Sequence, residues 1–336
     1  MRALIFGVSG QDGAYLSEFL LNRGYQVWGV SRDAAAGTFS KLRHLGILER
    51  VKTLSASLTD FRSVLTCLVA ADPQEVYNLG GQSSVSLSFE QPVETMESLA
   101  LGTLTLLEAV RFTGKKIRVY NAGSSECFGN VGDTRANEDT LFRPRSPYGV
   151  AKSAAHWEVV NYREAYGVFA CNGILFNHES PLRPERFVTR KVISAVARIA
   201  KGSTEKLHLG NIEIVRDWGW APEYVQAMWT ILQQPVPADF VIATGHSYSL
   251  KEFVAAAFEQ VGLDWESFVE RDKAMIRPSD IRFSYADPSR AEQVLGWRAT
   301  KKMHDVVRLM LAAELADSRL EPRSDTYVDT GKIVHP

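Results

Sequence analysis

The chain begins with Arg2-Ala-Leu-Ile-Phe-Gly7-Val-Ser-Gly10-Gln-Asp-Gly13. The first residues form a short apolar run typical of a buried strand, and residues 15–23 continue with helical periodicity. Between them, glycines spaced Gly-x-x-Gly-x-x-Gly permit a tight turn and a close approach of the backbone to a pyrophosphate. We therefore predict a dinucleotide site that is contacted by Gly7, Ser9, Gly10, Gln11, Asp12 and Gly13.

Apolar runs and helical patterns alternate along the chain after this loop. Further strands are expected at 24–31, 51–58, 75–79, 117–120, 169–175 and 239–244, with helices at 61–70, 95–113, 148–166 and 222–233. This alternation indicates a parallel sheet with helices on both faces. We predict an α/β fold with a Rossmann-like, doubly wound parallel sheet and a smaller C-terminal α/β substrate-binding domain. Ligands of such sheets bind at the carboxyl ends of the strands.

The end of the second strand normally meets the adenosine ribose of a dinucleotide, and here it carries Arg32 and Asp33. Arg32 could pair with a 2′-phosphate, which favours NADP, whereas Asp33 could accept from a free 2′-hydroxyl, which favours NAD. Arg43 on the next helix adds weight to NADP. The fourth strand ends where the dinucleotide must pass, and mostly small residues stand there: Leu79, Gly80, Gly81 and Ser83.

The fifth strand leads into Asn121-Ala-Gly-Ser-Ser-Glu-Cys-Phe-Gly129, and Tyr148-Gly-Val-Ala-Lys152 follows. The first stretch presents two hydroxyls and one carboxylate, those of Ser124, Ser125 and Glu126. On a helix, the spacing of Tyr148 and Lys152 places both side chains on one face. A lysine ammonium beside a phenol favours the phenolate and lowers its pKa from about 10. Such a phenol can take a proton from an alcohol while a hydride leaves the same carbon.

The second half of the chain contains a polar cluster, Phe176-Asn-His-Glu-Ser-Pro-Leu-Arg183, directly after the sixth strand. Helices are expected from residue 187 and at 250–262, 287–297 and 304–316. The polar tail after residue 318 is expected to be mobile or to dock on a partner subunit. Four basic residues in this half could hold a diphosphate: Arg190, Lys191, Arg216 and Arg277.

The composition restricts the class of function. The chain has 336 residues, of which 45% are apolar and 23% charged, a balance typical of globular proteins. The formal net charge of −1 argues against a surface dedicated to nucleic acid. Neither the three cysteines nor the seven histidines show metal-like spacing, so no metal is expected. Without a signal peptide or a membrane-length apolar run, we expect a cytoplasmic protein with free thiols and no membrane partner.

Longer motifs run through the whole chain. They are Gly-Val-Ser-Gly-Gln-Asp-Gly-Ala-Tyr-Leu (7–16), Tyr-Asn-Leu-Gly-Gly-Gln-Ser (77–83), Ser-Ser-Glu-Cys-Phe-Gly (124–129), Pro-Arg-Ser-Pro-Tyr-Gly-Val-Ala-Lys (144–152), Gly-Ile-Leu-Phe-Asn-His-Glu-Ser-Pro-Leu-Arg (173–183), Phe-Val-Thr-Arg-Lys (187–191) and Arg-Asp-Trp-Gly (216–219). At these residues the chain resembles the extended short-chain dehydrogenase/reductases and, within them, the GDP-mannose 4,6-dehydratases. The resemblance runs from residue 3 to about residue 313.

The resemblance implies a reaction on a GDP-sugar with a regenerated nicotinamide cofactor. Tyr148, tuned by Lys152, would take the proton of the sugar 4-hydroxyl while the cofactor takes the C4 hydride, and Ser124 would hold that hydroxyl. Glu126 would then remove the acidified C5 hydrogen and help to expel the C6 hydroxyl as water, and the hydride would return to C6. Glu126 is the discriminating residue, because the related sugar epimerases resemble this site in tyrosine and lysine but lack the carboxylate.

The resemblance also implies further contacts. The cofactor, NADP with NAD as the alternative, would touch not only the glycine loop and the residues after the fourth strand but also Arg32, Ser57, Leu58, Tyr148, Lys152, His178 and Arg183. The nucleotide sugar would touch Ser83, Ser124, Ser125, Glu126, Asn177, Lys191, Asn211, Arg216 and Arg277. A homodimer or homotetramer is expected.

The chain departs from the family pattern at several positions. The family's second strand ends in paired arginines followed by serines, which bind the 2′-phosphate and lie at a tetramer contact, whereas this chain has Arg32-Asp33-Ala-Ala-Ala. Ser57 stands for an adenine-binding Asp, Ser124 for the usual Thr, Gly80-Gly81 for Ala-Ala or Gly-Ala, and Gly123 for Ser. Smaller residues near the sugar could admit a bulkier one, which keeps GDP-manno-heptose beside GDP-mannose as a substrate.

These observations predict a nucleotide-sugar 4,6-dehydratase that converts GDP-mannose to GDP-4-keto-6-deoxymannose and serves deoxysugar synthesis for surface glycans. The alternatives are the same reaction on GDP-manno-heptose, a nucleotide-sugar 4-epimerase, 4-oxidase or reductase, and a non-catalytic nucleotide-binding regulator. We expect a dinucleotide-binding domain over 1–175 plus about 212–245. A nucleotide-sugar-binding domain is expected over about 176–211 plus 246–336.

Overall fold

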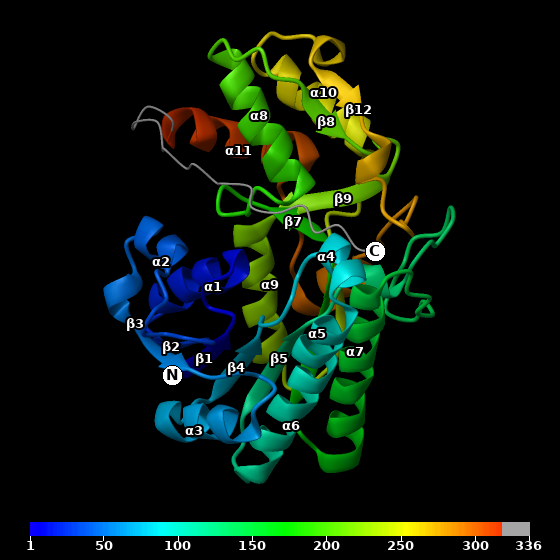
Figure 1. Cartoon of the computed structure of the whole chain (residues 1–336). Helices are drawn as coiled ribbons and strands as arrows, with labels where there is room; N and C mark the ends of the chain where they lie inside the picture. The colour runs from blue at the N-terminus through cyan, green and yellow to red at the C-terminus, as the bar shows by residue number, and fades with distance from the viewer. Residues whose placement is uncertain (318–336) are drawn as a thin grey trace, which may run out of the picture.

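The computed structural model describes residues 1–317 and centres on a seven-stranded sheet (Figure 1). The strand order is β10-β6-β5-β4-β1-β2-β3, and every neighbouring pair is parallel. This confirms the predicted doubly wound sheet. The strands are β1 (Arg2–Phe6), β2 (Gln26–Ser31), β3 (Val51–Ser55), β4 (Glu75–Asn78), β5 (Arg118–Ala122), β6 (Ala170–Leu175) and β10 (Phe240–Ile242).

Helices cover both faces of this sheet, and alternate strand residues face the two layers (Figure 1). Ile5 and Tyr77 belong to the buried cluster under α1 and α9, whereas Leu4 and Val76 belong to the cluster under α3, α6 and α7. Because both faces are covered, the strands read as continuous apolar runs. The helices of the first layer are α1 (Gln11–Leu21), α2 (Ser40–His44) and α9 (Ala221–Gln233), and those of the second are α3 (Phe61–Ala71), α6 (Gly102–Phe112) and α7 (Pro147–Tyr166).

Two helices differ in detail from their expected ranges. α1 begins at Gln11 rather than at residue 15, because Gly10 serves as its N-cap in an extended conformation. The helix expected over 95–113 is divided into α5 (Pro92–Met96), the π-helical turn η2 (Glu97–Leu101) and α6, and α4 (Val85–Glu90) precedes it. The expected helix over 222–233 corresponds to α9 and buries Tyr224 and Met228 fully but Trp229 only in part.

Two smaller sheets and three helices lie at the carboxyl edge of the large sheet (Figure 1). A three-stranded sheet joins β7 (Asn177–Glu179), β9 (Val215–Trp220) and β11 (Ser247–Ser249), and a two-stranded sheet joins β8 (Leu207–Leu209) and β12 (Val269–Arg271). α8 (Val188–Ala200), α10 (Leu250–Glu259) and α11 (Met303–Asp317) pack around a separate apolar cluster that includes Val192, Phe253 and Val307. The short turns are η1 (Leu48–Arg50), η3 (Ser125–Cys127), η4 (Trp265–Ser267), η5 (Lys273–Met275) and η6 (Ala291–Leu295).

β9 lies within the range expected for the dinucleotide-binding domain, but it pairs with β7 and β11 instead of joining the large sheet. Between residues 1 and 317, no helix is long and apolar enough to cross a membrane. The tail that was predicted to be mobile or to dock, and the C-terminal end of the expected sugar-binding domain, lie outside the described residues.

Candidate active site

Two adjoining cavities lie where the strands of the large sheet end. The glycine-loop cavity has a volume of about 550 Å³ and the Tyr148 cavity has a volume of about 360 Å³. They share a wall, which is made by Asp12, residues 79–83, Arg183, Arg186 and Phe187. One elongated ligand, or two ligands that meet end to end, can therefore span both cavities.

The glycine-loop cavity fits a dinucleotide. Gly7 has φ +83°, and a Cβ there would lie 2.5 Å from the carbonyl oxygen of Leu79, so only glycine allows the loop to pass this close to the end of β4. No side chain caps the N-terminus of α1, which leaves its first N–H groups for an anion. Of the predicted cofactor residues, this cavity is lined by Gly7, Ser9, Gly10, Gln11, Asp12, Gly13, Arg32, Ser57, Leu58, Leu79, Gly80, Gly81, Ser83 and Arg183.

An ion pair ties the glycine loop to β7 at the shared wall. The Nε2 atom of His178 lies 3.0 Å from Asp12 Oδ2, and its Nδ1 lies 2.8 Å from the Phe176 carbonyl oxygen. The imidazole also stacks on Tyr224 at a centroid distance of 4.5 Å. The pKa of Asp12 is lowered to about 2: burial alone would raise it, but His178 outweighs that effect. Although burial opposes it, the Asp12 carboxylate raises the pKa of His178.

α7 places Tyr148 and Lys152 in the other cavity, one helical turn apart. The helix starts sharply because Ser146 Oγ accepts the N–H of Gly149 at 3.0 Å and Pro147 occupies the first turn. Lys152 is buried, and its Nζ donates to the Ala122 carbonyl at 2.7 Å. Burial lowers the pKa of Lys152 to about 8.

The predicted lowering of the Tyr148 pKa is wrong for this structure. Burial raises that pKa well above its usual value, although the hydroxyl of Ser124 acts in the opposite direction. Lys152 Nζ lies 5.9 Å from the centroid of the Tyr148 ring and is hydrogen-bonded to Ala122 rather than to the phenol. The loss of hydration around the phenolate therefore outweighs the two groups that favour ionisation, the hydroxyl of Ser124 and the charge of Arg183.

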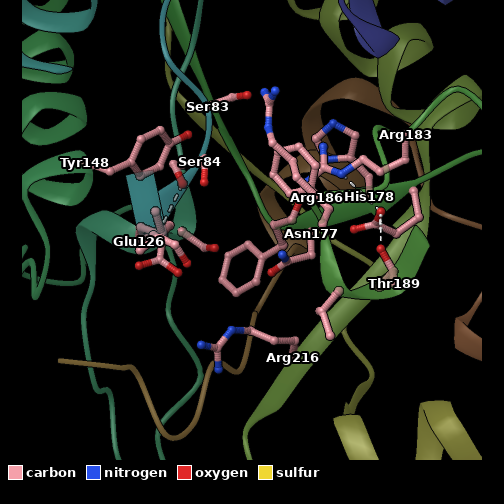
Figure 2. Close-up of a pocket in the computed structure, with 18 of the residues that line it drawn as sticks. Ser83, Ser84, Glu126, Tyr148, Asn177, His178, Arg183, Arg186, Thr189 and Arg216 are labelled. Atoms are coloured by element: carbon pink, nitrogen blue, oxygen red, sulfur yellow. Dashed lines mark hydrogen bonds and ion pairs between the residues drawn. The ribbon is translucent and has the colours of Figure 1, made fainter. Parts of the chain in front are cut away.

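Glu126 lies in the short turn η3, which follows β5 after two residues, and Ser124 is the N-cap of that turn. Ser124 Oγ accepts the N–H of Glu126 at 3.2 Å, which fixes the turn. Burial raises the pKa of the Glu126 carboxyl, while Arg216 and Arg277 lower it and Asp280 raises it. Figure 2 shows Tyr148 and Glu126 on one side of the cavity, opposite Asn177, His178 and Arg183. A phenol, a hydroxyl and a carboxylate thus meet in one cavity.

Two arginines approach this cavity from the opposite wall. Asp280 Oδ1 lies 3.0 Å from Nη2 of Arg216 and 3.4 Å from Nη1 of Arg277. Arg216 also donates to the Ile281 carbonyl at 2.8 Å, and Arg277 Nε donates to Ser86 Oγ at 3.0 Å. With Arg183, Arg186 and Lys191, which also line the cavity, these arginines provide a concentration of positive charge that suits an anionic ligand.

Every predicted substrate residue lines the Tyr148 cavity: Ser83, Ser124, Ser125, Glu126, Asn177, Lys191, Asn211, Arg216 and Arg277. Tyr148, Lys152 and His178 line it too. Arg190 does not, because it forms an ion pair with Glu314 on α11. Arg43 lines neither cavity and donates to the Thr38 carbonyl at 3.0 Å.

The structure adds cavity residues that the sequence analysis missed. Arg186 and Lys41 are basic, but only the direction of their side chains shows that they face a ligand site. Asp280 could have been predicted as an ion-pair partner of Arg277, because it lies three residues after that arginine in the sequence. Other polar residues that line the Tyr148 cavity and were missed are Gln82, Ser84, Ser86, Glu179 and Thr189.

The glycines that replace larger family residues do not enlarge the sugar site. A Cβ at Gly123 would lie 3.1 Å from the Gly173 carbonyl oxygen, and a Cβ at Gly80 would lie 2.6 Å from Leu58 Cδ1. At Gly81, which has φ +103°, it would lie 2.5 Å from Leu99 Cδ2. All three directions lead into packed protein. The expectation that these residues make room for a bulkier sugar is therefore wrong.

The sheet, the glycine loop and the Tyr–Lys helix define an extended short-chain dehydrogenase/reductase. Among solved structures, a UDP-glucose 4-epimerase from Thermus thermophilus in complex with NAD is 26% identical with a TM-score of 0.81, covering 94% of this chain and 99% of that one. A family model described as GDP-mannose 4,6 dehydratase matches residues 4–310. This chain belongs to the GDP-mannose 4,6-dehydratase family.

Curated members of this family match the chain over nearly their full length. GDP-mannose 4,6 dehydratase 2 of Arabidopsis thaliana is 45% identical over 339 residues, which cover 98% of this chain and 90% of the relative. A GDP-mannose 4,6-dehydratase of Vibrio cholerae is 44% identical over 348 residues, with 94% of each chain covered.

Proposed function

We propose that the protein is a GDP-mannose 4,6-dehydratase that forms GDP-4-keto-6-deoxymannose without net redox change. The observation that carries this proposal is the position of Glu126, whose carboxylate lies in the same cavity as Tyr148 and Ser124 and faces two arginines. For oxidation at C4, the protein itself needs to supply only the phenol and the hydroxyl, because the hydride goes to the nicotinamide. A carboxylate beside them adds a base for the C5 hydrogen, which elimination of water requires.

Tyr148 accepts the proton of the sugar 4-hydroxyl, and Ser124 holds that hydroxyl in place. Tyr148 accepts this proton in its phenolate form, and the ammonium of Lys152, buried 5.9 Å from the centroid of the ring, favours that form electrostatically. A nicotinamide dinucleotide in the glycine-loop cavity supplies the hydride acceptor at C4 and the hydride donor at C6. Arg216 and Arg277, with Lys191, bind the diphosphate, and Asn177 and Asn211 lie along the nucleotide-sugar path.

Glu126 performs the elimination. Its raised pKa makes it a stronger base than an exposed carboxylate, so it can take the C5 hydrogen once the neighbouring ketone has acidified it. The same carboxyl, now protonated, can deliver that proton to the C6 hydroxyl as it leaves. One proton moves from C5 to the departing water. When the hydride returns to C6, C5 regains a proton, and the proton that Tyr148 took from the 4-hydroxyl balances it.

The finer assignments are part of the same proposal. NADP is the preferred cofactor, and the dinucleotide-binding domain covers 1–175 plus about 212–245. The protein acts in the cytoplasm as a homodimer or homotetramer. Its product enters deoxysugar synthesis for surface glycans. GDP-manno-heptose has no support from the glycine substitutions, whose Cβ directions lie outside the sugar path.

The test is the product mass after incubation of the protein with GDP-mannose and, in parallel, with GDP-manno-heptose. Loss of one water from GDP-mannose, at a higher kcat/KM than from the heptose, is expected. Glu126→Gln should still reduce the bound cofactor, seen as nicotinamide absorbance, but should release no dehydrated product. An unchanged mass with both sugars while cofactor is bound, or near-normal dehydration by Glu126→Gln, would contradict the proposal.

A further inference from the structure

One corner of the glycine-loop cavity is separate from the reaction chemistry. It lies where β2 and β3 end, and Lys41 of α2 and Glu94 of α5 line it as well. In doubly wound sheets, the adenosine ribose of a dinucleotide meets the end of the second strand. The polar and charged groups that line this corner are Ser9, Ser31, Arg32, Lys41, Ser57, Thr59 and Glu94.

Asp33 does not line this corner of the cavity. Its Oδ1 accepts the N–H groups of Ala35 and Ala36, each at 3.0 Å, and so stabilises the loop after β2. One carboxylate oxygen is therefore committed to the protein backbone, which weakens the sequence feature that favoured NAD.

Arg32 reaches the corner with a charge that is partly compensated. Its Nη1 lies 3.8 Å from Glu94 Oε1, and 87% of its side chain is exposed. An exposed pair at this distance contributes little to stability, so its geometry is easily changed by a competing anion. Glu94 itself lines the cavity and would repel a phosphate placed there.

Lys41 differs from Arg32 because no carboxylate compensates it. Its Nζ donates to the carbonyl of Ser9 in the glycine loop at 3.1 Å, and within residues 1–317 it forms no ion pair. Burial and the nearby Arg186 lower the pKa of Lys41. An anion beside the amine would relieve both effects, since it would replace lost hydration and offset the repulsion between the two cations.

We propose that Lys41 is the residue that selects NADP over NAD by binding the 2′-phosphate, and that Glu94 weakens this preference by opposing the same phosphate. This inference rests on the nicotinamide cofactor of the proposed function. It assigns recognition to α2 and to the glycine loop rather than to a pair of arginines after β2. Arg43, on the same helix but outside the cavity, has no part in it.

The test compares the dissociation constants of NADPH and NADH for the full-length protein, measured by nucleotide fluorescence or calorimetry without sugar substrate. Lys41→Met should weaken NADPH binding about 10- to 100-fold, the usual effect of a lost charge-assisted hydrogen bond, and change NADH binding less than about twofold. Arg43→Met is the matched control and should change neither. Glu94→Gln should tighten NADPH binding about two- to fivefold and leave NADH unchanged.

Equal weakening of NADPH and NADH by Lys41→Met would overturn the proposal, because the amine would then serve the pyrophosphate or the loop. An unchanged affinity of Lys41→Met for NADPH would also overturn the proposal, as would a wild-type protein that binds NADH more tightly than NADPH. Lys41→Arg provides a second variant that keeps the charge and should retain most of the preference. Because binding is measured without turnover, failure here leaves the dehydratase proposal intact, and failure of dehydration leaves this result interpretable.

Discussion

The two walls of the Tyr148 cavity are built from different kinds of structure. One wall consists of the turn after β5 and the first turns of α7, both anchored to the large parallel sheet. The opposite wall comes from short strands and irregular segments, including Asn211, residues 275–277 and Asp280. The regular wall holds a phenol, a hydroxyl and a carboxylate, whereas the irregular wall holds mainly permanent positive charges.

This difference suggests a division of labour. Groups on the regular wall have pKa values displaced by burial, so they are suited to exchanging protons, and the sheet fixes their positions. The guanidinium groups on the other wall stay charged at any working pH and are suited to holding a diphosphate. We therefore expect changes on the regular wall to lower kcat and changes on the irregular wall to raise KM.

The largest expected effect comes from Tyr148→Phe, which removes the phenol and leaves the ring. Loss of a general base or acid typically lowers the rate by about 10²- to 10⁴-fold, so kcat should fall by this amount while KM changes little. Steady-state kinetics with GDP-mannose measures both values. Tyr166→Phe, near the exposed end of the same helix, is the control. A change mainly in KM would contradict the division between the walls.

Arg277→Met tests the irregular wall and should have the next largest effect. The loss of a hydrogen bond to a charged group is worth about 1.5–3 kcal/mol, so KM should rise roughly 10- to 150-fold at nearly constant kcat. Arg282→Met is the matched control, because Arg282 is exposed and does not line the cavity. If kcat instead falls as strongly as in Tyr148→Phe, Arg277 acts on the transition state and the two walls share the chemistry.

The same contrast explains how much of the site the sequence revealed. Ser124, Glu126 and Tyr148 could be placed because each follows a strand or begins a helix whose apolar pattern is clear, and the ends of parallel strands meet at one edge. Arg186 and Asp280 lie in segments without periodicity, so nothing in the sequence shows which way they point.

Two other errors came from quantities that only packing determines. The direction of the Tyr148 pKa depends on how completely the phenol is buried, which the spacing to Lys152 does not reveal. The role of Gly123 depends on where its missing Cβ would point, and the neighbour it would meet is Gly173, on a different strand. Local sequence patterns carry no information on either quantity.

The pH dependence of kcat provides a third prediction for the regular wall. Glu126 must be ionised to act as a base, and its pKa is raised, so activity should appear only above its usual 4.5. Lys152 must stay protonated, and its pKa is lowered to about 8, so kcat should fall as the pH rises through that value. Lys152→Arg keeps the positive charge, so in this variant the fall of kcat on the alkaline side of the pH profile should shift to higher pH. An alkaline limb unchanged in this variant would exclude Lys152 as its source.

The smallest effect is expected from Gly123→Ala, although Gly123 lines the cavity beside Ser124. The added Cβ would lie 3.1 Å from the Gly173 carbonyl oxygen and 3.4 Å from Ile174 Cα, so it presses on β6 rather than on the ligand. We expect a loss of about 1 kcal/mol in the free energy of unfolding. The ratio of kcat/KM for GDP-mannose to that for GDP-manno-heptose should change less than about twofold.

Gly81→Ala sharpens this comparison, because at φ +103° its Cβ would meet Leu99 Cδ2 at 2.5 Å and Ser98 O at 3.0 Å. This variant should lose more stability than Gly123→Ala, again without a change in sugar preference. Thermal unfolding and competition between the two GDP-sugars measure the two quantities separately. If Gly123→Ala instead changes the sugar ratio about tenfold, a backbone position on the regular wall sets substrate choice, and the division between chemistry and binding fails at that point.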